Sequence, residues 1–186
     1  MRTIVLEVTN KYTKPSFLLT DKGKRDMRDV YNTIGPMIKG RTLVMSSDQP
    51  RAQQAATMLG GADELTHHKQ LCGRKPEDTP WFVYHLRKKE KDFSTCVVIT
   101  HWDLLKDLCL VGLEDYDVVL DNRFHIIAFD SGHVNDDLYS GLVIEELPEG
   151  ENLDNLDFPE FIQGKVEFSK DFTEDEERFL RSVGIL

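Results

Sequence analysis

Short apolar runs rich in β-branched residues alternate along this chain with longer segments of helical spacing. The clearest runs are residues 3–8 (TIVLEV), 42–46 (TLVMS) and 94–100 (STCVVIT). Each run predicts a strand, and strands that alternate with helices are typical of a parallel sheet covered on both faces. We therefore expect an α/β protein, a three-layer α/β/α sandwich with a mostly parallel central sheet.

Capping and breaking residues suggest where the helices begin and end. Thr20 or Asp21 can cap the first helix, while Pro50 suits the first turn of the second and Gly60 its end. A third helix is expected to begin at Pro80. Residues 62–79 are expected to form a loop, and a short strand is the alternative for this segment. A further helix is expected at 102–113, followed by paired strands at 123–130 and 141–147.

The acidic charge of the chain is concentrated near its C-terminus. Of the net charge of −10, residues 141–186 carry 13 acidic and 4 basic side chains, so the rest is almost neutral. We expect residues 1–147 to form the α/β domain, and residues 148–186 to form an acidic extension that ends in a helix and packs on that domain. The extension is expected to be a solvated surface, with a basic protein partner as the alternative.

Composition also excludes several classes of protein. No basic patch of a nucleic-acid binder is present, and no run of 18 apolar residues indicates a membrane span. The short apolar stretch at the N-terminus is not that of a secretory signal, so we expect a cytoplasmic protein. Three cysteines without CxxC spacing suggest neither disulfides nor a metal site, and no cofactor is expected.

Polar side chains follow each of the three clearest strands. Ser47 and Arg51 follow the second, His101 follows the third, and Asn10 follows the first. The carboxyl ends of parallel strands are where such sheets bind ligands. An arginine and a histidine at neighbouring strand ends can hold a phosphate, since the guanidinium donates to two oxygens and the imidazole to a third. We therefore predict a phosphate site at Ser47, Arg51, His101 and Asn10, lined by Glu7 and Trp102.

Motifs around these residues resemble those of the histidine phosphatase superfamily, which has the phosphoglycerate-mutase-like fold. Residues 46–56 (SSDQPRAQQAA) resemble its pattern Ser-Ser-Pro-x-x-Arg-Ala-x-Gln-Thr-Ala, with Asp48 in place of the proline. Residues 18–23 (LLTDKG) are similar to its Leu-Thr-Glu-x-Gly helix start, and 97–102 (VVITHW) to its second histidine motif. The short interval between Arg51 and His101 is most similar to that of the small phosphohistidine-phosphatase branch.

The resemblance also implies a nucleophile that this chain lacks. In that family an Arg-His-Gly motif ends the first strand; its histidine attacks phosphorus and its arginine holds the phosphoryl group. Here Val8 or Thr9 occupies the histidine position, and Glu7 or Val8 the arginine position. Valine cannot form a phosphoenzyme, and threonine would need an activating base. A carboxylate about 4 Å from a phosphate would also repel it by about 4 kcal/mol at an effective dielectric near 20.

Three functions remain open from the sequence. We favour a catalytically degenerate protein that binds a phosphorylated or other anionic ligand, or a partner, through the residual site. The first alternative is an interaction protein whose site is closed. The second is an active phosphatase, acting on phosphoric monoesters or phosphohistidine, that uses His101 with water or Thr9 as nucleophile.

Overall fold

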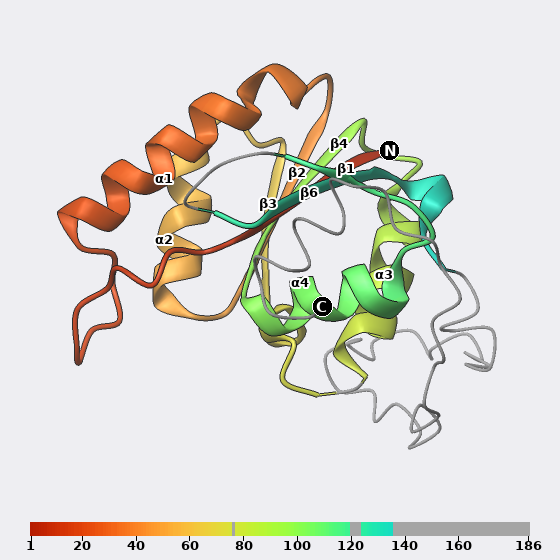
Figure 1. The fold of residues 1–186 in the computed structure, drawn as a ribbon. Helices are drawn as coiled ribbons and strands as arrows, with labels where there is room; N and C mark the ends of the chain where they lie inside the picture. Colours follow the sequence, from red (N-terminus) through yellow and green to blue (C-terminus); the bar gives the residue numbers. More distant parts are fainter. Residues whose placement is uncertain (76, 120–123, 136–186) are drawn as a thin grey trace, which may run out of the picture.

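Six strands form one mixed sheet within residues 1–75, 77–119 and 124–135, which the computed structural model describes. The strands lie in the order β3-β2-β4-β1-β6-β5, and helices cover both faces (Figure 1). Strands β1 to β4 are parallel, whereas β6 runs antiparallel to β1 and β5 antiparallel to β6. The expected three-layer fold with a mostly parallel sheet is thus confirmed.

Strands and helices alternate along the chain. The strands and α-helices are β1 (Arg2–Glu7), α1 (Asp21–Ile34), β2 (Thr42–Ser47), α2 (Pro50–Leu59), β3 (Glu64–His68), α3 (Asp78–Lys89), β4 (Thr95–Thr100), α4 (Trp102–Asp107), β5 (Asp117–Val118) and β6 (Ile126–Asp130). The 3₁₀ turns are η1 (Gly35–Met37), η2 (Lys69–Cys72) and η4 (Ser131–His133), and η3 (Leu108–Gly112) is a π turn. A helix therefore separates each parallel strand from the next along the chain, as a crossover connection requires.

Each face of the sheet carries its own apolar core. Helices α1 and α2 pack on one face, where Leu6 and Val8 are buried. Helices α3 and α4 lie on the other face, where Val5 packs with Trp81 and Phe82 (Figure 1). Successive side chains of a strand point to opposite faces, so β1 contributes to both cores.

The strand register brings three carboxyl ends together. Glu7 at the end of β1 pairs with Thr100 at the end of β4, and Ser46 of β2 pairs with Ile99 of β4. The residues that follow these strands therefore meet at one edge of the sheet.

Three of the predicted helix boundaries are confirmed, the start of α1 and both ends of α2. The Thr20 hydroxyl caps α1 by accepting a hydrogen bond from the Gly23 N–H at 3.1 Å, and α2 runs from Pro50 to Leu59, directly before Gly60. These are positions where side-chain and backbone preferences act locally.

Two later boundaries differ from prediction. Helix α3 begins at Asp78, before Pro80, because the buried Asp78 carboxylate accepts hydrogen bonds from the backbone N–H groups of Arg74 and Lys75 and fixes the preceding turn. The predicted helix 102–113 is α-helical only to Asp107 and continues as the π turn η3. Residues 64–68 form the edge strand β3, the alternative left open for this segment.

Several expectations concern residues outside the described part of the chain. The strand 141–147 and the acidic extension 148–186 with its closing helix all lie there. Within the described part, no helix has both the length and the apolar character needed to cross a membrane.

Candidate functional site

Ser47, His101 and Arg51 form a continuous hydrogen-bonded chain at the carboxyl edge of the sheet. The Ser47 Oγ lies 2.7 Å from His101 Nε2, and the Arg51 Nη2 lies 3.0 Å from His101 Nδ1. Ser47 ends β2, Arg51 lies in the first turn of α2, and His101 directly precedes α4. The structure thus brings together three of the four residues predicted to bind phosphate, and we call this group the clamp.

The clamp fixes the protonation state of His101. A guanidinium can only donate, so His101 Nδ1 accepts from Arg51, and the ring proton on Nε2 is donated to Ser47. Burial, then the positive charges of Arg51 and Arg74, lower the pKa of His101 to about 4, against an opposing effect of Asp48. His101 is therefore a neutral imidazole at ordinary pH, and neighbouring protein groups occupy both of its nitrogens.

Arg51 is held from a second side by an aromatic ring. Its guanidinium carbon lies 4.7 Å from the centre of the Tyr12 ring, a cation–π contact. The Arg51 Nε is buried and has no hydrogen-bond partner among the residues that the structure describes. A buried donor left unpaired costs about 1–3 kcal/mol, so an acceptor at this edge of the guanidinium would be stabilising.

Residues of the two motifs at 18–23 and 46–56 position the loop that carries Tyr12. The Gln54 side-chain oxygen accepts a hydrogen bond from the Leu19 N–H at 2.8 Å, which ties the loop to α2. The Lys11 carbonyl accepts from the Thr20 N–H at 2.9 Å, and a Cβ at Gly23 would lie 2.4 Å from that carbonyl oxygen. Gln54 therefore ties the loop to α2, whereas Thr20 and Gly23 hold it against the start of α1.

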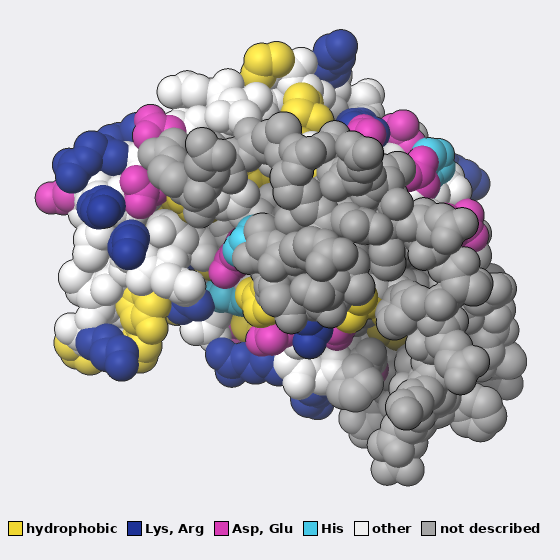
Figure 2. Space-filling model, viewed as in Figure 1, with side chains coloured by type: hydrophobic (Ala, Val, Ile, Leu, Met, Phe, Trp, Pro, Cys, Tyr) yellow, Lys and Arg dark blue, Asp and Glu magenta, His cyan; other side chains and the backbone are white. Residues whose placement is uncertain are grey.

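The tip of the same loop is exposed. Phe17 and Leu18 are 39% and 43% exposed, and the Phe17 ring centre lies 5.7 Å from that of Tyr12. Figure 2 shows hydrophobic side chains beside Lys and Arg side chains at the lower left, where Figure 1 places this loop. The loop thus extends outward from the Arg51 contact to solvent.

The two residues predicted for the nucleophile position, Val8 and Thr9, are both buried. Val8 is 1% exposed, its side chain lies in the apolar core beneath α1 and α2, and its N–H donates to the Thr100 carbonyl at 2.9 Å. Thr9 is also buried, and its hydroxyl oxygen accepts a hydrogen bond from the Lys11 N–H at 3.3 Å. Neither side chain has a neighbouring base in the described contacts.

Glu7, predicted to line the site, has a partner of its own. Its carboxylate lies 2.6 Å from His125 Nδ1, and the His125 ring packs against Trp102 with centres 5.2 Å apart. The Glu7 carboxylate thus bonds to His125, and its place in the lining of a phosphate site stays a prediction.

Asn10 was predicted to bind phosphate, whereas Cys72 was not. Asn10 is exposed, and no described side-chain hydrogen bond joins it to the clamp. Cys72, which the sequence did not single out, donates to the Asp48 carboxylate at 3.4 Å, and burial followed by Asp48 raises its pKa to about 11.

The histidine pair at the end of β3 is separated by the strand pleat. His67 Nδ1 lies 2.7 Å from the Ser46 Oγ, whereas the His68 ring packs against Trp81 and His85 on the opposite face. Within the described residues, no group of three or more His, Cys, Asp or Glu side chains is arranged to hold a metal ion.

Among the comparisons with known proteins, the one with solved structures bears on the fold. Neither the protein-family models nor the curated proteins include a match for this sequence. Among solved structures, a protein assigned as the phosphohistidine phosphatase SixA of Nakamurella multipartitia has a TM-score of 0.50 and 16% identity over 61% of this chain. The match spans 64% of that protein's length, which is less than two thirds.

A second solved structure is similar over more of its length. A protein assigned as an alpha-ribazole-5'-P phosphatase from Escherichia coli has a TM-score of 0.50 and 12% identity, and the match covers 73% of this chain and 93% of that one. Identities this low bear on the fold alone. The chain has the fold of the histidine phosphatase superfamily, as its motifs predict.

Proposed function

We propose that this chain is a non-catalytic protein of the histidine phosphatase fold that binds a phosphate-like anion at the clamp. The register of β1 against β4 carries the proposal. Glu7 pairs with Thr100, so the next residues are Val8 on one strand and His101 on the other. Val8, which faces His101 across this register, supports the proposal because a valine cannot accept a phosphoryl group.

Donors and charge at the clamp favour an anion. The Arg51 Nε has no partner among the described residues, and the Ser47 hydroxyl accepts the His101 Nε2 proton at 2.7 Å, which leaves its own proton available to an acceptor. Arg51 and Arg74 both lower the pKa of His101, so the field at the imidazole is mainly positive although the whole chain is acidic. Arg51 also lies at the N-terminus of α2, where the helix dipole favours negative charge.

The same contacts argue against His101 as an acid or base. A general acid needs a proton near neutral pH, but the pKa of His101 is lowered to about 4. A general base needs a free lone pair, but the Nδ1 lone pair accepts the Arg51 hydrogen bond. The active-phosphatase alternative therefore has the least support.

Thermal unfolding with added inorganic phosphate tests anion binding. At a phosphate concentration 100 times Kd, linkage predicts about 2.7 kcal/mol of stabilisation, which raises the Tm of a chain of this size by about 5–10 °C. We expect saturable stabilisation of the natural protein and its loss in Arg51→Ala. The exposed Arg28 of α1 offers a matched control, and Arg28→Ala should respond like the natural protein.

Equal stabilisation of Arg51→Ala and the natural protein would place the anion elsewhere and contradict the proposal. Potassium chloride at matched ionic strength separates site binding from general screening.

A closed clamp is the second candidate, and the direct bond between Arg51 and His101 favours it. In this case the clamp residues satisfy one another, and the chain acts by binding a partner, with the acidic residues 141–186 suited to a basic surface. Absence of any saturable stabilisation by phosphate or sulfate would favour this candidate over anion binding.

Turnover assays test the non-catalytic part of the proposal. With para-nitrophenyl phosphate and with phosphoramidate, whose P–N bond resembles that of phosphohistidine, we expect no hydrolysis above the uncatalysed rate. Hydrolysis that His101→Ala abolishes would show instead that the site is a repurposed phosphatase.

A further inference from the structure

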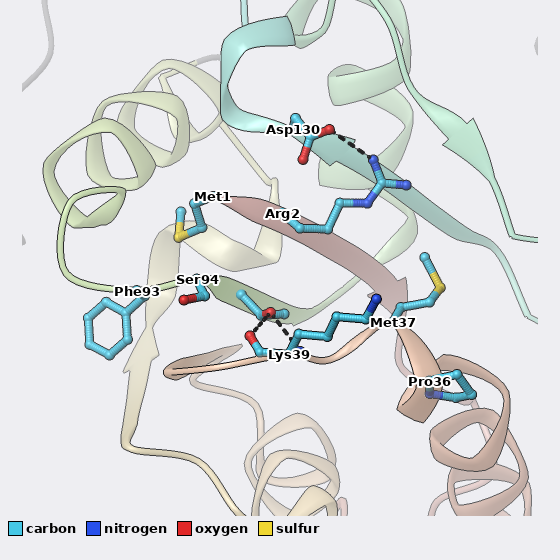
Figure 3. A pocket seen from close by; sticks show the side chains of 9 residues that line it. Met1, Arg2, Pro36, Met37, Lys39, Phe93, Ser94 and Asp130 are labelled. Carbon is cyan, nitrogen blue, oxygen red and sulfur yellow. Dashed lines mark hydrogen bonds and ion pairs between the residues drawn. The ribbon is translucent and has the colours of Figure 1, made fainter.

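A pocket of about 630 Å³ lies at the opposite edge of the sheet from the clamp (Figure 3). We call it the amino-edge pocket, and its walls include Arg2, Met37, Lys39, Phe93, Ser94 and Asp130. These residues come from the starts of β1 and β4, the turn η1 and the end of β6. The volume lies within the range of about 300–1,000 Å³ that is usual for small-molecule sites.

The cationic groups that line this pocket, on Met1, Arg2 and Lys39, differ in their pairing. The Arg2 guanidinium forms ion pairs with Asp117 and with Asp130, the latter at 3.5 Å, and Figure 3 shows it turned toward Asp130. The exposed Lys39 has no ion pair or side-chain hydrogen bond among the described residues. The Met1 ammonium donates to the Ser131 Oγ at 3.1 Å, so among the described cations of this pocket the Lys39 ammonium is the one without a polar side-chain partner.

The backbone fixes Lys39 in place. The Thr95 hydroxyl accepts a hydrogen bond from the Lys39 N–H at 3.0 Å and donates one to the Lys39 carbonyl at 2.7 Å. At Gly40, where φ is +65°, a Cβ would lie 2.7 Å from the Ser94 Oγ, so the chain passes close to the start of β4. Because this segment is already ordered, a ligand would lose little free energy in ordering it.

Apolar side chains supply the other walls. Phe93 is 5% exposed and fixed in the core, whereas Met1 and Met37 are partly exposed and line the pocket from opposite sides (Figure 3). Methionine side chains adapt to ligand shape and are common at binding surfaces. A small inorganic ion would leave these walls unused, whereas a neutral apolar molecule would leave the Lys39 ammonium unpaired.

We propose that the amino-edge pocket binds an organic anion with a single acidic group. The acidic group pairs with the Lys39 ammonium, and the apolar body of the ligand packs against Met37 and Phe93. Strand β1 runs from this pocket to the clamp, and its five residue steps span about 16 Å. The site is therefore separate from the clamp and independent of the function proposed for it.

Binding of anilinonaphthalene sulfonate, a fluorescent apolar anion, provides the test. We expect one saturable site that octanoate displaces and inorganic sulfate does not. Lys39→Met should weaken binding about fivefold or more, the factor that corresponds to an ion pair of about 1 kcal/mol. Lys22→Met, at an exposed lysine of α1 outside the pocket, is the matched control and should bind like the natural protein.

Two further measurements locate the site. The dye should shift the backbone amide resonances of Met37, Lys39 and Ser94, and Met37→Gln should weaken binding by making the wall polar without changing the charge. Displacement by sulfate, equal affinity in Lys39→Met and Lys22→Met, or resonance shifts confined to other residues would each overturn the proposal.

Discussion

The lowered pKa of His101 makes the stability of the protein depend on pH in a defined direction. In the folded chain the pKa is about 4, against 6.5 for the same group without perturbation. The unfolded chain therefore takes up a proton as the pH falls below 6.5, while the folded chain keeps His101 neutral until about pH 4. Stability is therefore at its full value above pH 6.5, the pKa of His101 in the unfolded chain, and it is lost as the pH falls from 6.5 to about 4.

The size of this effect follows from the two pKa values. Their difference corresponds to a loss of about 3 kcal/mol over the whole window, and about 2 kcal/mol of it should be lost between pH 8 and pH 5. His101→Gln removes the titration, while its amide oxygen can still accept from Arg51 and its NH₂ group can donate to Ser47.

Urea unfolding of both proteins between pH 8 and pH 5 measures the effect. Burial raises the pKa of Asp78 and of Asp107, and these carboxyls act in the opposite direction. They are present in both proteins and cancel in the difference. Equal pH dependence of the natural protein and His101→Gln would refute the reasoning, because His101 would then titrate alike in the folded and unfolded chain.

Three further predictions concern close packing and thiol chemistry. Gly23→Ala should lower the free energy of unfolding by about 1–3 kcal/mol in urea titrations, because the new Cβ would meet a loop carbonyl at 2.4 Å; Gly35→Ala, with nothing within 4 Å, should be neutral or stabilising. Gly73→Ala should cost about 2–4 kcal/mol in the same titrations, since φ is +63° and its Cβ would lie 2.2 Å from the Leu104 nitrogen. Cys72, with a pKa of about 11, should react with iodoacetamide at pH 8 about 100-fold more slowly than an exposed thiol, as peptide mass spectrometry can measure.

The fold was largely predictable because its signals are local. The continuous apolar run of β4 and the cap at Thr20 act within a few residues, and each is where the sequence indicated. The start of α3 was not predictable from Pro80, because it depends on the Asp78 carboxylate and the backbone before it. The edge strand β3 has alternating burial and neighbouring histidines, so its sequence is only weakly strand-like.

The contents of the site were predictable only in part. Ser47, Arg51 and His101 could be assigned to one site because they follow neighbouring strands. Their hydrogen bonds to one another could not be predicted from those positions. Glu7 and His125 lie 118 positions apart and meet because β1 and β6 are antiparallel, a direction that the sequence pattern does not reveal. With Leu6 paired to Ile126, the next residues in the register are Glu7 and His125.

Phosphorus NMR of the full chain with phosphoramidate and inorganic phosphate tests anion binding and the absence of turnover in one experiment. We expect the inorganic phosphate resonance to broaden or shift with the natural protein but not with Arg51→Ala, and the phosphoramidate signal to decay only at its uncatalysed rate. A phosphoramidate signal that disappears faster with the natural protein than with His101→Ala, or a phosphate resonance that the protein leaves unchanged, would contradict the proposed function.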